Sequence, residues 1–245
     1  MRKSGINSET PNDFVLGAGV VFKNFKYIYS EYKGTEPSSA DEIKLSQITN
    51  PGVSFIAAAD GYTPQVGDYV TGAWDDSEDN VLGATNGGNK LAISPEITPI
   101  EVDGATVKVK GLEQKTSEAA LLEVNLAQHT VESFKRAIVG KEVTSIIPGY
   151  KQIETKALIE LSDYLDNIAY VGSMTDGTDI IAIMENAICT SGLELESKNK
   201  ETSVVKTTFE ATADFAGGIY DKLPVYIFYP DKSTQAKKIY RVVEG

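Results

Sequence analysis

The sequence contains a single cysteine, Cys189, and a single histidine, His129. One cysteine excludes a disulfide within the chain, and one residue of each kind leaves no basis for a thiolate or imidazole metal cluster. Cys189 lies in a predicted strand and His129 lies just before a predicted helix, so both are interpreted as structural. We therefore predict no metal and no cofactor.

Long apolar runs are also missing. The longest ones, residues 55–59 and 180–184, have five residues each, whereas a membrane helix needs about 20. The first residues, MRKSGINSETPNDF, include two basic side chains but no apolar core, so no secretory signal is expected. These absences predict a protein that is made and used in an aqueous, reducing compartment without a membrane partner.

Positive charge is scarce. The chain has 23 basic and 35 acidic residues and a formal net charge of −12. Such a balance argues against a protein that clamps nucleic acid by neutralising its phosphates. Ordinary solubility explains the sign equally well.

No catalytic motif is recognisable. The segment GATNGGNK (83–90) lacks the spacing of a phosphate-binding loop and no helical pattern follows it. Asp176 and Asp179 lack the ligand pattern of a calcium loop, and a plain hairpin turn is the favoured interpretation. Since no nucleophile, acid or base is held by suitable neighbours in the pattern, we expect no enzymatic activity.

Strand patterns are abundant instead. Residues 14–25 carry β-branched and aromatic residues, and apolar and polar positions alternate within residues 119–127 and 203–214. The alternation predicts half-buried strands whose inward side chains are Leu122, Val124, Leu126, Val205, Phe209, Ala211 and Ala213.

Two glycine-containing turns stand out in residues 82–111, LGATNGGNKLAISPEITPIEVDGATVKVKG. Gly87-Gly88 and Asp103-Gly104 are predicted to reverse the chain, because such pairs adopt the positive φ angles of tight hairpins. The segment is therefore interpreted as strand, turn, strand, turn, strand.

One helix is expected at about residues 130–139. Thr130 is a suitable N-cap, Gly140 a suitable end, and Val131, Phe134 and Ile138 recur with helical spacing. These three side chains are the predicted packing face.

Residues 31–80 are rich in Gly, Pro, Ser and Asp and are interpreted as a long loop insertion. The loop contains the only tryptophan beside an acidic run, and it is either a solvated surface or an interaction loop. The candidate contact residues are Trp74, Asp75, Asp76, Glu78 and Asp79. The predicted fold is mainly β: a single sandwich or barrel domain with one flanking helix, the long loop, and extended arms at 1–13 and 231–245.

The order of these features resembles the major tail tube proteins of long-tailed, non-contractile bacteriophages. The resemblance lies in LGAGVVFKNF near the N-terminus, in the 82–111 segment, in LLEVNLAQHTVESFKRAI, and in ICTSGLELESKNKETSVVKTTFEATAD with the later PVYIFYP. Together these stretches lie within residues 14–30 and 81–230, and residues 31–80 match no part of the pattern.

The resemblance implies a β-sandwich with a flanking helix, whose copies form stacked hexameric rings around a tape-measure protein. It also implies contacts with tail terminator and distal tail proteins, and passage of DNA without specific binding. The expected location is the virion tail, after assembly in the host cytoplasm. Loop 31–80 would then be an inter-ring contact, and the Gly87-Gly88 and Asp103-Gly104 turns would shape a sheet shared between subunits.

Two other classes remain open. A monomeric β-sandwich binding or adhesion module, for example a carbohydrate-binding one, would present an exposed aromatic platform. An enzyme would need a cleft with a perturbed carboxylate pair.

Overall fold

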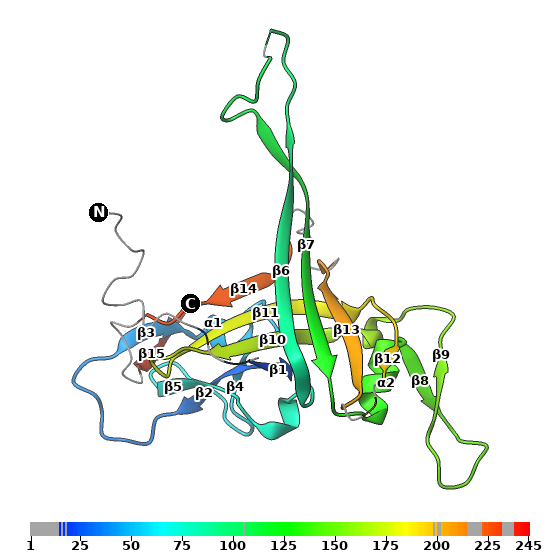
Figure 1. Ribbon diagram of the computed structural model, residues 1–245. Coiled ribbons are helices and arrows are strands. Elements are labelled where there is room, and N and C mark those ends of the chain that lie inside the picture. Colours follow the sequence, from blue (N-terminus) through cyan, green and yellow to red (C-terminus); the bar gives the residue numbers. More distant parts are fainter. Residues whose placement is uncertain are drawn as a thin grey trace, which may run out of the picture. The chain divides into compact units, whose positions relative to one another are not determined.

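The computed structural model describes residues 15, 17, 19–104, 106–197, 199, 202–214, 222–231 and 238–245. Strands predominate among these residues, which confirms the predicted mainly-β fold class. The elements are β1 Val20–Lys23, β2 Tyr27–Glu31, β3 Asp41–Lys44, α1 Leu45–Thr49, β4 Ile56–Ala58, β5 Tyr69–Trp74, η2 Glu78–Asn80, β6 Thr85–Pro99, β7 Glu113–Leu126, α2 Val131–Ala137, β8 Gly140–Val143, β9 Gln152–Thr155, η3 Leu161–Asp163, β10 Leu165–Ser173, β11 Asp179–Cys189, β12 Glu194–Glu196, β13 Val204–Ala211, β14 Val225–Phe228 and β15 Ile239–Val243 (Figure 1).

The chain forms two compact units, where a single domain is expected from the sequence. Unit 1 falls within residues 1–82, 165–185 and 227–245, and unit 2 within residues 83–164 and 186–226. The predicted N-terminal arm, 1–13, lies outside the described residues.

Unit 1 contains a five-stranded sheet in the order β3-β15-β5-β2-β4. The β15–β3 and β2–β4 pairs are parallel, and the other two pairs are antiparallel. Helix α1 adds Ile48 to the core of this sheet, which also buries Tyr29, Ile43, Val70 and Val242.

This sheet corrects two predictions. Residues 31–80 are not a long loop, because they supply β3, α1, β4 and β5 to unit 1. The end of the chain is not an extended arm, because β15 lies between β3 and β5 and its Val242 is fully buried. The strands in both segments are short, and β3 and β15 are paired with each other although they lie near opposite ends of the chain.

A second group of strands in unit 1 is β1, β10 and the first part of β11. Strand β1 pairs with β10 in antiparallel register, with Val21 opposite Tyr170. Asp176 lies in the turn between β10 and β11, where its carboxylate accepts hydrogen bonds from the N–H and hydroxyl of Thr178. The prediction of a plain hairpin turn at this position is confirmed.

Unit 2 contains the antiparallel strands β13, β7 and β6, with β12 and residues 187–189 of β11 also paired to β13. Leu122, Val124 and Leu126 of β7 are at most 1% exposed, and Val205 and Phe209 of β13 are equally enclosed at 0% and 2%. The period-two patterns therefore predicted the inward faces correctly, except that Ala213 is exposed beyond the end of β13.

Helix α2 begins and ends close to the predicted positions. Its N-cap is Thr130, whose hydroxyl accepts a 3.0 Å hydrogen bond from the N–H of Ser133, while the Ser133 hydroxyl accepts one from the Thr130 N–H. The helix buries Ser133 and Ala137, whereas the predicted packing residues Val131, Phe134 and Ile138 are only half-buried.

Candidate assembly surface

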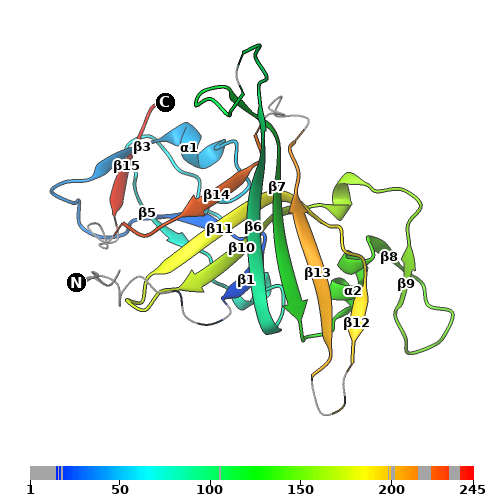
Figure 2. The same cartoon turned by 45° about the horizontal axis from the view of Figure 1, so that its top comes forward.

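The most prominent feature of unit 2 is the β6–β7 hairpin, which stands out as a long twisted ribbon (Figures 1 and 2). Strand β6 has 15 residues, and a rise of about 3.3 Å per residue gives it a length of roughly 50 Å. The two strands stay paired up to Pro99 opposite Glu113.

Burial divides the hairpin into a base and an arm. In the base, where β13 pairs with it, β7 alternates between buried and half-buried residues from Ala120 to Leu126, as expected for a strand with one covered face. The arm comprises residues 95–118 and includes the tip of the hairpin. Nearly every position of its two strands is exposed. Among the described residues of unit 2, the arm is therefore mostly unpacked.

Polar side chains hold the two strands of the arm together. The Ser117 hydroxyl donates a 2.7 Å hydrogen bond to Glu96, and the hydroxyls of Thr98 and Thr116 lie 3.2 Å apart across the strands. Such exposed cross-strand pairs each contribute a few tenths of a kcal/mol up to about 1 kcal/mol. A two-stranded ribbon of this kind is only marginally stable in water without a partner surface.

Both edges of the arm are open among the described residues. Strand β6 pairs only with β7, and β13 reaches β7 only at Leu121–Leu126. Unpaired N–H and C=O groups along a strand are a template for another chain. Pro95 and Pro99 and the register shift between Glu96 and Ile97 interrupt the β6 edge and so restrict where a partner strand can add.

The tip of the arm, residues 100–112, corrects the predicted hairpin. Asp103-Gly104 does lie in a turn, and Gly104 has a φ of +90°. The following residues 106–112 are not a strand, and β7 begins only at Glu113. Apolar side chains at the tip are solvent-exposed, with Val107 at 75% and Ile100 at 48%.

The Gly87-Gly88 pair does not reverse the chain, which corrects the second predicted turn. Both glycines lie inside β6 at a register shift between Thr85 and Asn89, with φ angles of +90° and +85°. The Asn125 side chain donates a 2.9 Å hydrogen bond to the Gly88 carbonyl at this bulge. A bulge and a tight turn both need positive φ, so the glycines fit either.

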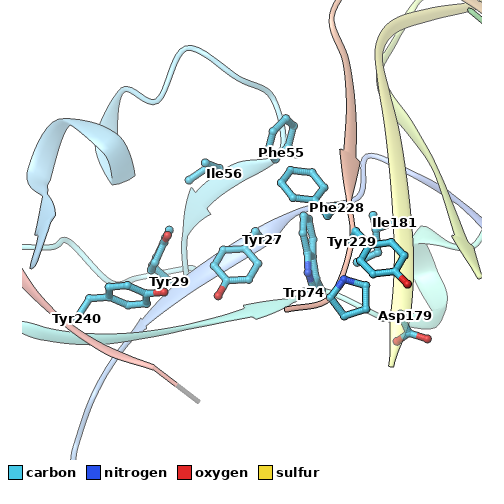
Figure 3. A pocket seen from close by; sticks show the side chains of 11 residues that line it. Tyr27, Tyr29, Phe55, Ile56, Trp74, Asp179, Ile181, Phe228, Tyr229 and Tyr240 are labelled. Carbon is cyan, nitrogen blue, oxygen red and sulfur yellow. The ribbon is translucent and has the colours of Figure 1, made fainter. Parts of the chain in front are cut away.

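Unit 1 carries a second surface feature, an aromatic cleft of about 490 Å³ (Figure 3). Its lining comes from β2, β4, β5, β11, β14 and β15 and the residues beside them. The lining residues are Tyr27, Tyr29, Phe55, Ile56, Trp74, Asp179, Ile181, Phe228, Tyr229, Pro230 and Tyr240.

Trp74 is the centre of the aromatic contacts in this cleft. Its ring stacks on Phe25, and its neighbours Tyr27 and Phe228 meet it edge-on at centroid distances of 5.0 and 5.2 Å. The predicted interaction-loop tryptophan is therefore the last residue of β5 and a packed, half-buried side chain.

Two tyrosines of the cleft, Tyr27 and Tyr29, are partly shielded from water. Burial raises the pKa of Tyr29 to about 12, and the nearby Tyr27 and Tyr240 add to the shift. Burial is also the main cause of the raised pKa of Tyr27. Both hydroxyls remain neutral hydrogen-bond donors well above physiological pH.

Sequence reasoning missed this cleft, although aromatic residues at alternate positions of KYIYSEY and PVYIFYP signal its walls. Alternation places Tyr27 and Tyr29 on one face of β2, but the pairing of β2 with β5 and of β5 with β15 is needed to bring them near Trp74 and Tyr240.

The acidic run after Trp74 is partly structural. The carboxylate of Asp75 accepts hydrogen bonds from the Ser77 N–H and from the Asn80 side chain, at 3.2 and 2.8 Å. Asp76, Glu78 and Asp79 are exposed at the start of or within η2. Of the proposed contact residues, only these three present their charge freely to solvent.

One contact between a histidine and a hydroxyl group is present among the described residues. Nε2 of His129 lies 2.8 Å from the Ser203 hydroxyl, but no carboxylate among the described residues orients the other ring nitrogen, as an acyl-transfer triad requires. In the described part of the chain no three His, Cys, Asp or Glu side chains group around a possible metal position. None of its helices has the length and apolar character needed to cross a membrane.

No family model and no curated protein matches the sequence. Among solved structures, a crystal structure of an Hcp protein is similar at a TM-score of 0.24 and 14% sequence identity, over 77% of this chain and 86% of that chain. A TM-score of that size is too low to show a shared fold.

Proposed function

We propose that this protein is a structural subunit of a non-contractile phage tail tube, which assembles into stacked hexameric rings. The observation that carries the proposal is the β6–β7 arm, whose strands are exposed on both faces and open at both edges within the part of the chain that the structure describes. A lone subunit gives this ribbon neither a further strand partner nor a packed face among the described residues. Another copy can supply both.

The ordered sequence features that resemble tail tube proteins support the same proposal. They include the hairpin segment 82–111, the strand before α2 and the helix itself. In this role the rings enclose a tape-measure protein, bind terminator and distal tail proteins at the two ends, and later conduct DNA.

The charge of the chain suits a conduit. Six copies at −12 each give a ring of −72. An acidic assembly repels the phosphate backbone, whereas a basic one would retain DNA through counterion release.

The direct test compares the full chain with a variant in which Asn-Gly replaces residues 95–118. Ser94 and Ala119 are paired in register, so a two-residue turn closes the shortened hairpin there. The full chain should form rings or tubes in electron micrographs as its concentration rises. The shortened chain should keep its far-ultraviolet circular dichroism per residue and its melting temperature but sediment as a monomer.

Two results would count against this function. A full chain that stays monomeric at every concentration overturns the proposal as a whole. If the shortened chain still forms tubes, the tube function stands, but the arm is not required for assembly.

The aromatic cleft favours one alternative, a monomeric carbohydrate-binding or adhesion module. Aromatic walls with tyrosine hydroxyls and the Asp179 carboxylate are a suitable lining for a sugar. Because Trp74 is the only tryptophan and lines this cleft, sugars titrated into the protein should change its fluorescence if this alternative holds. A concentration-independent monomer would favour the alternative further.

A further inference from the structure

A short loop in unit 2, residues 156–163, is held closed by a charged clasp. The ammonium of Lys156 lies 2.7 Å from carboxylate oxygens of both Glu160 and Asp163. Asp163 also accepts a 2.8 Å hydrogen bond from the N–H of Glu160. The side chains of Lys156 and Asp163 are only 14% and 7% exposed, whereas Glu160 is 65% exposed, so the Lys156–Asp163 pair is the covered part of the clasp.

The clasped loop displays its apolar side chains outward. Leu158, Ile159 and Leu161 are 78%, 62% and 91% exposed. A monomer rarely displays large aliphatic side chains side by side unless they mark an interaction site. Because the loop is already fixed by its clasp, docking it against a partner costs little conformational entropy.

The same chain carries a hollow lined mainly by aromatic side chains, the cleft of unit 1, whose lining also includes the Asp179 carboxylate. Its volume of about 490 Å³ is large enough for the leucine and isoleucine side chains of the loop. The hydroxyls of Tyr27 and Tyr29 have no hydrogen-bond partner among the described residues, and they are suitable donors to carbonyl groups of an entering loop.

We propose that loop 156–163 of one copy inserts Leu158 and Leu161 into the aromatic cleft of the next copy. A protrusion and a hollow at different places on one chain make a head-to-tail contact, which repeats from copy to copy and closes into a ring when the rotation allows. This inference rests on the proposed assembly function and assigns the cleft to a second copy of this chain.

The test uses two variants. In one the loop can no longer dock, and in the other the cleft can no longer accept a loop. The loop variant carries Leu158→Asp and Leu161→Asp, and both positions are exposed enough to leave folding intact. The cleft variant carries Tyr229→Asp, at a rim residue that is 60% exposed, together with Trp74→Phe to remove its fluorescence. Circular dichroism and thermal melts of each variant establish that it is folded.

Each variant alone should need a concentration roughly tenfold higher or more to assemble, the scale expected when anchor side chains are lost. Mixed together, they should form a 1:1 dimer in sedimentation, because the loop variant keeps an intact cleft and the cleft variant an intact loop. The emission of Trp74, present only in the loop variant, should shift to shorter wavelength as the other variant is added.

A matched control adds Ile146→Asp to the cleft variant. Ile146 is 85% exposed in the connection between β8 and β9, and its replacement should leave the 1:1 dimer unchanged. Loss of the dimer in this control would show that the neighbouring hairpin, and not the loop alone, makes the contact, and it would overturn the assignment.

Three further outcomes separate the inference from the proposed function. Normal tubes from the loop variant overturn the inference and leave the tube function standing. Absence of a dimer in the mixture also overturns it. A difference in Trp74 emission between the wild type and the loop variant, at dilutions where both are monomeric, would place the loop in its own cleft and exclude the contact between copies.

Discussion

Phe25 and Trp74 stack with their ring planes 5° apart and their centroids 5.1 Å apart. Phe25 follows β1 and is 2% exposed, and its backbone N–H donates a 2.8 Å hydrogen bond to the buried side chain of Asn167. The stack therefore connects β5 to the β1–β10 strands within unit 1. It makes the single tryptophan a stabilising element of this unit as well as a wall of the cleft.

Replacing Trp74 with alanine should lower the free energy of unfolding by about 3 kcal/mol. The substitution removes the ring stacked on Phe25 and leaves a cavity beside Tyr27 and Phe228. Urea unfolding followed by circular dichroism measures the change without relying on tryptophan fluorescence. The control Tyr229→Ala, at the exposed rim of the same cleft, should change stability much less, and equal losses for the two variants would contradict a packing role for Trp74.

Neutralising Asp163 should destabilise the protein in a pH-dependent way. Burial alone would raise the pKa of Asp163, but hydrogen bonds from Lys156 and from the Glu160 N–H outweigh it and lower the pKa below the usual 3.8. A carboxyl whose pKa is lowered by folding stabilises the protein above its unfolded pKa, and this stabilisation is lost as the pH falls through the folded value. The effect is thus complete at neutral pH.

Asp163→Asn should therefore cost about 1 kcal/mol at pH 7, the scale of an ordinary hydrogen bond. The difference from wild type should shrink as the pH is lowered below about 4. Urea unfolding at a series of pH values measures it. A difference that stays constant down to pH 3 would mean that the ion pair with Lys156 is not its source.

Gly88→Ala should weaken the base of the β6–β7 hairpin. A methyl group added at Gly88 would meet no atom within 4 Å apart from those of its chain neighbours, so the substitution tests the backbone alone. At a φ of +85° an alanine is strained by about 1 to 2 kcal/mol. Thermal unfolding should show this loss, while the nearby exposed Asn86→Ala should not, and equal melting temperatures for the two variants would rule out the bulge conformation.

The sequence was most informative where a segment buries one face locally. Leu122, Val124 and Leu126 alternate with polar residues because β7 is covered on one side, and this pattern can be followed without knowing the partner strand. Helix α2 was equally predictable, because its cap at Thr130 lies within the same short segment.

Residues 31–80 could not be assigned correctly for the opposite reason. Ile43 belongs to a four-residue strand whose partner residue is Val242, near the other end of the chain. A short strand with one buried side chain has no periodicity of its own, and turn residues dominate its neighbourhood. Only the long-range pairing reveals it as sheet.

At the tip of the arm, alternating apolar and polar residues do not indicate a strand. Val107 and Val109 alternate with lysines as in a strand, but both lie in the exposed tip and neither belongs to a strand. The pattern normally reports a buried face, and within the described residues the tip has no surface to be buried against. If another copy covers it in the assembled tube, the alternation is explained by that contact.

Removing charge from the exposed acidic run tests whether it contributes to stacking of rings. Asp76→Asn, Glu78→Gln and Asp79→Asn should be combined, while Asp75 is kept because it holds Ser77 and Asn80. Deleting the whole stretch 72–80 is unsuitable, since residues 72–74 belong to β5. The triple variant should change the free energy of unfolding by less than about 0.5 kcal/mol, as expected for exposed positions.

If the run is an inter-ring contact, this variant should still form single rings but far shorter tubes than the wild type in electron micrographs. A second triple variant, Glu42→Gln, Asp60→Asn and Glu244→Gln, removes the same charge at exposed positions outside the arm and controls for repulsion between copies. Wild-type tube lengths for the first variant would exclude the run as a stacking contact. Equal shortening in both variants would attribute the effect to net charge and not to the position of the run.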